Sequence, residues 1–238
     1  NYLLTHFISD DAYYYFTPAR NAVLGYGLSF DKLSVTNGFH YLYIIFILPF
    51  YIFISKDLFL SLKIITVVNL LLHQINVILI FVITKQFIKS YKNSNLLAAL
   101  FSFFWLINPI ILGNVLSLLE FTLNYTVLLF LIYMIIIQHK IKKNIFLLIL
   151  ILLFLVRTDN FIFIILFALL FTFKQKNNIK LLWYYIFWII IFFIITTLIS
   201  YYFTNDFLQV SGLAKLYHNR FNTTFFLKRL TYYFEIAF

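Results

Sequence analysis

Cysteine is absent from this sequence and charged residues are scarce, and each shortage excludes a class of protein. Without cysteine among its 238 residues, the chain has no disulfides, no thiolate metal ligands and no cysteine nucleophile. Charged residues make up 11% of the chain, against about a quarter in soluble domains. No glycine-rich nucleotide-binding loop and no Asp-x-Asp triplet occurs, which argues against an enzyme that binds a nucleotide-linked sugar. A soluble globular enzyme is therefore not expected.

Long runs of isoleucine, leucine and phenylalanine dominate instead. Hydrophobic residues make up 63% of the chain, and a stretch such as NIFLLILILLFLV has no polar face at any helical period. A helix that is apolar all round is buried in protein or in lipid. A helical span needs about 20 apolar residues, and four runs approach this length: 62–84, 95–113, 119–137 and 181–203. The sequence therefore predicts an all-α fold, a polytopic transmembrane helical bundle.

Three further apolar runs are too short for a comfortable crossing. Thirteen helical residues extend about 20 Å, whereas the hydrocarbon core is about 30 Å thick. We predict that 144–156 and 160–173 form a shallow hairpin with Arg-Thr-Asp-Asn at its tip. The run 41–55, which contains Pro49, is expected to lie in the interface or to re-enter.

Lysines predict the orientation. The connections 85–93, 139–144 and 174–180 contain nine lysines and no acidic residue, and the positive-inside rule places such loops in the cytoplasm. The net charge of +10 then reflects topology, and no nucleic-acid partner is expected. Residues 1–61 are predicted to form an external loop with interfacial or re-entrant helices, and residues 62–203 the transmembrane bundle. Residues 204–238 are predicted to form an external loop and the start of a further segment.

The same orientation gathers the remaining polar residues outside the membrane. The sequence begins with Asn and stops within an apolar pattern, so we expect a piece of a longer protein whose first span precedes it. No internal repeat is visible. The charged residues expected on the external side are Asp10, Asp11, Arg20, Asp31, Glu120, Arg157, Asp159, Asp206 and Lys215.

Two adjacent carboxylates, Asp10 and Asp11, have two interpretations. One of them, or Ser9, could cap the helix that follows. Alternatively, one acts as a general base while the other orients an acceptor or binds a metal. The three tyrosines at 13–15 are typical of an aromatic belt at the membrane interface.

Other polar residues have plainer interpretations. Gly25 and Gly27 favour a helix end and a turn, and Asn37-Gly38 favours a tight turn. His40 is an interfacial histidine or a site residue. Polar side chains within a span usually hydrogen-bond to neighbouring helices, which is the interpretation for His73, Gln74 and Asn76.

Charges at membrane depth carry more information. Each costs roughly 2.5–3.5 kcal/mol on insertion scales, so such residues pair or mark a functional cavity. Glu120, Arg157 and Asp159 could form an internal salt bridge, and an arginine could also bind a phosphate through its planar fork of donors. Lys215 adds a cation on the same side, or belongs to a surface loop.

Taken in order, these motifs resemble those of the GT-C superfamily of membrane glycosyltransferases. The acidic pair, the helix containing Arg20, Gly-x-Gly, TNGFH, the intramembrane Glu120, RTDN and SGLAK follow one another along nearly the whole chain. The resemblance is closest to the protein mannosyltransferase and aminoarabinose transferase branch. The sequence departs from the pattern at Tyr41, at Leu118-Leu119 and at Asn160, where proline, a glycine-containing pair and glycine are expected.

The resemblance implies sugar transfer, with inversion, from a polyprenyl-phosphate donor to a hydroxyl of a lipid, protein or glycan acceptor, at the external face of the plasma (inner) membrane. It implies that Asp10 or Asp11 is the catalytic base. It implies further that Arg157 and Lys215 bind the donor phosphate, and that the cavity or acceptor site is lined by Arg20, His40, Glu120 and Asp159. No particular cofactor is implied, and a divalent metal is possible, because Asp10, Asp11 and Glu120 supply oxygen ligands that a hard cation accepts.

Two alternatives remain open from the sequence. A transporter or flippase would also keep charges in an aqueous cavity, but the missing repeat and the clustering of polar residues on one side argue against it. A non-catalytic membrane subunit of the same fold is the other.

Overall fold

Helices make up the regular structure throughout the described part of the chain. The computed structural model describes residues 7–53, 57–137, 142–175, 179–205 and 207. Within these residues there is no β-strand, only an isolated bridge between Ser29 and Val35, so the all-α prediction is confirmed. The elements are η1 (Asp10–Ala12), α2 (Tyr13–Val23), α3 (Tyr41–Phe53), α4 (Leu58–Phe87), α5 (Ser94–Ile107), α6 (Pro109–Leu116), α7 (Phe121–Ile137), α8 (Lys143–Val156), η2 (Thr158–Asn160), α9 (Phe161–Lys174) and α10 (Ile179–Thr204).

Two helices, α4 and α10, are long and apolar enough to cross a membrane. They correspond to the predicted runs 62–84 and 181–203. Few of their side chains are buried within the protein, as expected of helices that face lipid. Their length and composition are compatible with an integral membrane protein.

The predicted span 95–113 is not one straight helix. It divides into α5 and α6, which are bent by 51° at Asn108. The cause is Pro109, because a proline disfavours helical conformation in the residue before it. Asn108 is extended, and its side-chain oxygen accepts hydrogen bonds from the backbone N–H groups of Ile110 (2.9 Å) and Ile111 (3.2 Å). The pair counts as a third span only if the two helices are taken together.

The predicted span 119–137 begins later than expected. Helix α7 starts at Phe121 and has 17 residues, about 25 Å at 1.5 Å per residue. Leu118 and Glu120 lie in the turn before it rather than in the helix. As a result, Glu120 belongs to a corner between α6 and α7.

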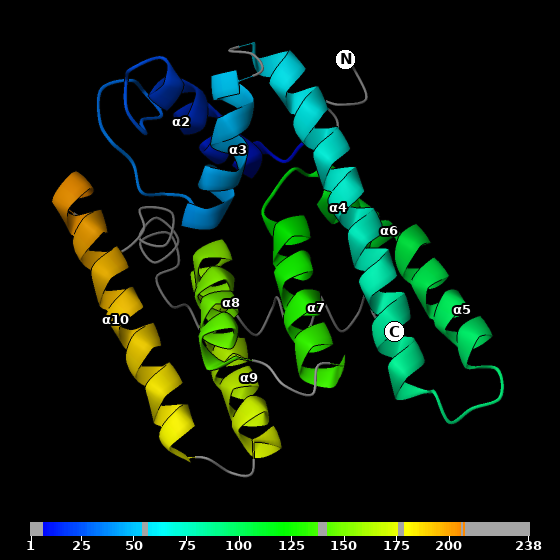
Figure 1. Ribbon diagram of the computed structural model, residues 1–238. Helices are drawn as coiled ribbons and strands as arrows, with labels where there is room; N and C mark the ends of the chain where they lie inside the picture. The colour runs from blue at the N-terminus through cyan, green and yellow to red at the C-terminus, as the bar shows by residue number, and fades with distance from the viewer. Residues whose placement is uncertain (1–6, 54–56, 138–141, 176–178, 206, 208–238) are drawn as a thin grey trace, which may run out of the picture.

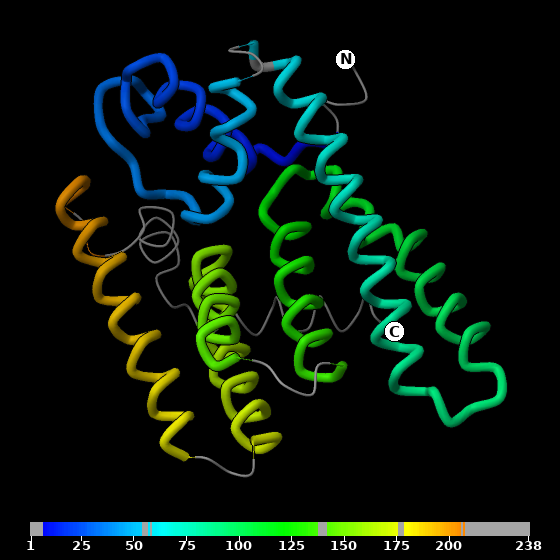
Figure 2. Tube along the Cα trace, in the orientation of Figure 1, coloured from blue at the N-terminus to red at the C-terminus, as the bar shows by residue number. Residues whose placement is uncertain are grey.

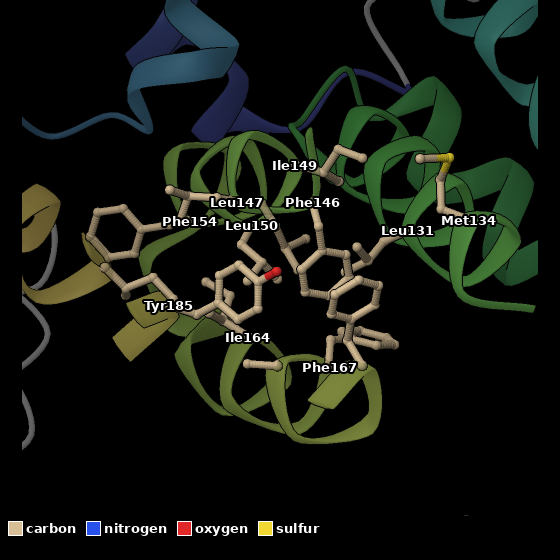
Figure 3. Close-up of a cluster of buried hydrophobic side chains, with 14 residues drawn as sticks. Leu131, Met134, Phe146, Leu147, Ile149, Leu150, Phe154, Ile164, Phe167 and Tyr185 are labelled. Carbon is tan, nitrogen blue, oxygen red and sulfur yellow. The ribbon is translucent and has the colours of Figure 1, made fainter. Parts of the chain in front are cut away.

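The two helices of the predicted hairpin are present. Helices α8 and α9 have 14 residues each, and the 3-10 turn η2 joins them at Thr158–Asn160. Their apolar side chains pack with those of α7 and α10 (Figure 3). The rings of Phe146 and Phe171 stack at 4.1 Å between centroids, and Tyr185 of α10 lies edge-on to both. This apolar cluster packs the hairpin against α7 and α10.

The two ends of the bundle differ in charge. Figure 1 shows that α4, α7 and α9 end, and α5 and α10 begin, at the lower end of the view, where Lys85, Lys174 and Lys180 occur in the sequence. Helices α2 and α3, the start of α4 and the corner before α7 lie at the upper end. The lysine-rich connections thus share one end, which is the arrangement that the predicted orientation requires.

The segment before α4 forms a cap over the upper end. Helices α2 and α3 pack together through Tyr15, Phe16, Tyr43 and Ile47, and the cluster reaches Leu118 in the corner before α7. The loop between α2 and α3 passes beside the upper end of α10 (Figure 2). The cap therefore contacts both the corner and the last described helix.

Two of the predicted turns in this loop have different outcomes. Gly25 and Gly27 have positive φ angles of 91° and 68°, and they end α2 and turn the chain as expected. The tight turn predicted at Asn37-Gly38 is wrong. Asn37 is buried, and its side-chain amide donates hydrogen bonds to the hydroxyls of Ser200 (2.5 Å) and Thr204 (3.1 Å) of α10.

Candidate functional site

Glu120 is a carboxylate buried at the junction of three segments that are far apart in the sequence. Its side chain is 6% exposed. The Tyr15 hydroxyl of α2 donates a hydrogen bond to Oε2 (2.9 Å), and Arg157, after α8, donates one to Oε1 (2.9 Å). His40 Nε2 lies 3.7 Å from Oε1. Glu120 thus joins the cap, the corner and the hairpin tip.

The corner before α7 presents Glu120 to these partners through a strained backbone. Leu118 has a φ of 56°, which is uncommon for a residue that is not glycine. The Tyr43 hydroxyl donates to the Leu118 carbonyl (2.6 Å), and the Ser9 N–H donates to the Ser117 carbonyl (3.2 Å). The Leu118 side chain is fully buried. Strain of this kind costs about 1–3 kcal/mol and clusters at functional sites.

Arg157 connects two carboxylates. Its Nε and NH2 atoms donate to both oxygens of Asp159, at 2.9 and 2.7 Å, while NH1 donates to Glu120. The guanidinium lies over the ring of Phe121, 4.9 Å from the centroid. A guanidinium has five N–H donors, so NH1 and NH2 each keep one that no carboxylate occupies. The side chain is 21% exposed, which leaves an approach to these donors.

Asn160 fixes the hairpin tip to α7. Its buried amide donates to the Asn124 side-chain oxygen (2.7 Å) and to the Leu153 carbonyl (2.9 Å). Asn124 in turn donates its backbone N–H to the Glu120 carbonyl (2.9 Å). Asn160 is therefore structural here, and its hydrogen bonds hold the hairpin tip, with Arg157, against the helix that follows Glu120.

Tyr15 is a site residue that the sequence interpretation missed. The aromatic-belt interpretation of 13–15 fits the exposed Tyr14, but it is wrong for Tyr15, which is buried. The Tyr15 ring is stacked with that of His40 (6.4 Å between centroids) and lies edge-on to Tyr43 (5.0 Å). The available signal was the helical spacing of Ala12, Tyr15 and Ala19, which share one buried face.

The site has a net negative charge. Two carboxylates meet one guanidinium, so the sum is −1 with His40 neutral. The hydrogen bonds from Arg157 hold the pKa of the Asp159 carboxyl below its usual value of 3.8, and the same bonds raise the pKa of Arg157. Burial, followed by the charge of Glu120, raises the pKa of Tyr15. Tyr15 is therefore a neutral donor that holds the Glu120 carboxylate.

The predicted catalytic pair lies beside this site and not within it. Asp10 and Asp11 are exposed at the start of η1, and their carboxylates make no hydrogen bond or ion pair with another described residue. The cap of η1 is Ser9, whose hydroxyl accepts from the Asp11 N–H (3.3 Å). Asp11 precedes Tyr15 by four residues, about one helical turn. Neither aspartate side chain is needed as the cap, so both remain available to a ligand.

The remaining predicted residues are dispersed. Arg20 is in the last turn of α2, and its positive charge acts on the Tyr51 hydroxyl of α3. Lys215 and Asp206 lie outside the described residues. Asp31 accepts hydrogen bonds from the backbone N–H groups of Leu33 and Ser34 in its own loop, and these lower its pKa. Of the predicted set, the structure brings together His40, Glu120, Arg157 and Asp159.

A metal site is not assembled in the described part of the chain. Across residues 7–53, 57–137, 142–175, 179–205 and 207, no three histidine or acidic side chains are grouped so that they could hold a metal ion. The oxygen set of Asp10, Asp11 and Glu120 is thus not gathered here. Comparison with known proteins adds no relative, because no family model, curated protein or solved structure matches the chain.

Proposed function

We propose that this chain carries the donor site of a membrane glycosyltransferase with a GT-C-like fold. The enzyme moves a sugar from a polyprenyl phosphate to an acceptor hydroxyl at the external face of the membrane. The observation that carries the proposal is Arg157: a partly exposed guanidinium, aligned by Glu120 and Asp159, with two N–H donors left for a ligand. Two adjacent carboxylates, which bond to no other residue in the described part of the chain, lie about one turn before Tyr15, which binds Glu120.

The depth of Arg157 supports a lipid-linked donor. A 14-residue helix is about 21 Å long, shorter than the hydrocarbon core of about 30 Å. A hairpin that starts at the lysine-rich surface therefore places its tip below the opposite surface. A polyprenyl phosphate keeps its tail in lipid and its phosphate near the headgroups, where such a tip can bind it.

The chemistry requires a base and a stabilised leaving group. The acceptor oxygen attacks the anomeric carbon and forms a new C–O bond, while the bond from that carbon to the phosphate oxygen breaks. The acceptor proton moves to Asp10 or Asp11, and the electron pair leaves on the phosphate. The free N–H donors of Arg157 stabilise this charge, as positioned cations do in such transition states. His40 and Glu120 form the wall beside it.

Variant kinetics in the full-length protein test these roles. We expect Asp10→Asn or Asp11→Asn to lower kcat for transfer by about 10²–10⁴, the usual contribution of a general base. Arg157→Lys should raise the donor KM or lower kcat, because lysine lacks the planar fork. Asp31→Asn is the matched control, because Asp31 is an exposed carboxylate in the same cap. Aspartate variants that are both as active as this control would refute the catalytic assignment.

A further inference from the structure

A row of polar side chains is buried on one face of α4. Asn69, His73 and Asn76 are spaced by four and three residues, so they share one side of the helix. Their exposed fractions are 0%, 1% and 1%. The sequence predicted that these polar residues hydrogen-bond to neighbouring helices. This prediction is confirmed for His73 and Asn76, but it is wrong for Gln74, which is exposed. The row lies in a helix long and apolar enough to cross a membrane.

These side chains satisfy only part of their hydrogen-bonding capacity. Asn76 donates its amide to the Thr122 carbonyl (3.4 Å), and His73 Nε2 lies 3.3 Å from the Leu106 carbonyl. Buried polar atoms in folded proteins almost always have a partner. Here several atoms on α4, α5 and α7 have none among the described residues: Asn69 Oδ1, His73 Nδ1, Asn76 Oδ1, Trp105 Nε1 and Thr122 Oγ1.

The chemistry of these atoms selects their ligand. Asparagine, tryptophan and threonine side chains carry no charge, and the set contains a donor (Trp105 Nε1) as well as acceptors (Asn69 Oδ1, Asn76 Oδ1). An ion at this buried position would find no charged side chain of opposite sign among these residues to offset its desolvation, and a lipid chain offers no hydrogen bonds. Water donates and accepts, and buried waters typically bind polar groups that the protein leaves unsatisfied.

We propose that α4, α5 and α7 enclose a bound-water site, in which internal water molecules bridge Asn69, His73, Asn76, Trp105 and Thr122. Thr122 lies two residues after Glu120, and the Asn69 amide lies within hydrogen-bond reach of the Tyr43 hydroxyl, which donates to the Leu118 carbonyl. The water site therefore lies against the corner that presents Glu120. This inference is independent of the enzyme activity proposed above.

Radiolytic footprinting of the purified full-length protein in H₂¹⁸O tests the proposal. Hydroxyl radicals formed from bound water oxidise the side chains next to that water, and mass spectrometry locates the label. His73 is compared with Met134, which is 4% exposed but lies among apolar side chains of the cluster between α7, α8 and α9. With each rate divided by that of the free amino acid, we expect His73 to be labelled at least tenfold faster. Equal or slower labelling of His73 would overturn the proposal.

A matched pair of variants checks that the protein groups hold the water. Asn69→Leu combined with Asn76→Leu removes its partners, so His73 labelling should fall to the Met134 level. Ser102→Ala is the control, because the buried Ser102 hydroxyl donates within its own helix to the Ala98 carbonyl, and labelling should not change. If gel filtration shows the double variant misfolded, Thr122→Val takes its place. Undiminished labelling in a folded variant would contradict the assignment of these residues.

Discussion

Replacing Glu120 by glutamine should destabilise the protein far more than replacing Asp159 by asparagine. Glu120 accepts two hydrogen bonds, from Tyr15 and from the charged Arg157. A hydrogen bond to a charged group contributes about 1.5–3 kcal/mol. Glutamine keeps the shape and one acceptor oxygen, so the variant loses one such bond and the charge that balances Arg157. We expect Glu120→Gln to lower the free energy of unfolding by about 2–3 kcal/mol.

The cost at Asp159 is smaller because water already screens this pair. The Asp159 side chain is 63% exposed, against 6% for Glu120. Exposed ion pairs contribute about 0–1 kcal/mol, and Arg157 keeps its bond to Glu120 when Asp159 is replaced. Asp159→Asn should therefore cost about 1 kcal/mol or less. At about 2–4 °C per kcal/mol for a chain of this size, the two variants should differ in Tm by several degrees.

The assay is the thermal unfolding of purified full-length protein in detergent at neutral pH, followed by tryptophan fluorescence. Asp31→Asn serves as the control, since that carboxylate bonds only within its own loop in the interactions described above. A Glu120→Gln variant with the wild-type Tm, or one less affected than Asp159→Asn, would refute the account of Glu120 as the buried junction.

Further predictions concern other parts of the same structure. The pKa of Asp159 is lowered in the folded state, so its ionised carboxylate stabilises the protein fully above about pH 3.8, and this stabilisation is lost as the pH falls below that value. The free energy of unfolding should therefore decrease less with falling pH in Asp159→Asn than in the wild type, as measured by acid unfolding. Asn160→Ala should cost about 1–3 kcal/mol, because it leaves the Asn124 oxygen and a carbonyl without their buried donor, and its Tm should fall accordingly. Lys32 is exposed with a φ of 66°, so Lys32→Gly should raise the unfolding free energy by about 0.5–1 kcal/mol, whereas Lys32→Val should lower it. Lys142→Cys adds a thiol to a chain that has none in these 238 residues, and an impermeant reagent should label this position only from the cytoplasmic side; external labelling of it would contradict the predicted orientation.

The sequence was informative where length and apolar composition decide the structure. Helices α4 and α10 are apolar over enough residues to be recognised without other information. The hairpin was predictable because RTDN separates two runs that are each too short to cross. The grouping of Glu120 with Arg157 and Asp159 followed from the cost of isolated charges at membrane depth, and the ion pairs at 2.9 and 2.7 Å agree with it.

The parts that sequence reasoning missed depend on contacts between distant segments. Leu118 adopts a positive φ with no glycine to indicate it, because burial of its side chain and the Tyr43 hydrogen bond hold the corner. Asn37-Gly38 has the composition of a tight turn, yet α10 supplies hydroxyls that the Asn37 amide binds instead. The bend at Asn108 had a local signal in the sequence, namely Pro109. It was missed because the span 95–113 was predicted from apolar composition alone.

The central claim is that the full-length protein transfers sugar from a polyprenyl phosphate, and direct transfer in membranes is its most direct test. Membranes that contain the wild type, or the Asp10→Asn/Asp11→Asn double variant at equal expression, are given a panel of radiolabelled polyprenyl-phosphate sugars. The account predicts that label leaves at least one lipid donor and appears in an acceptor with the wild type, and not with the double variant. No transfer by the wild type from any donor, or equal transfer by the double variant, would contradict it.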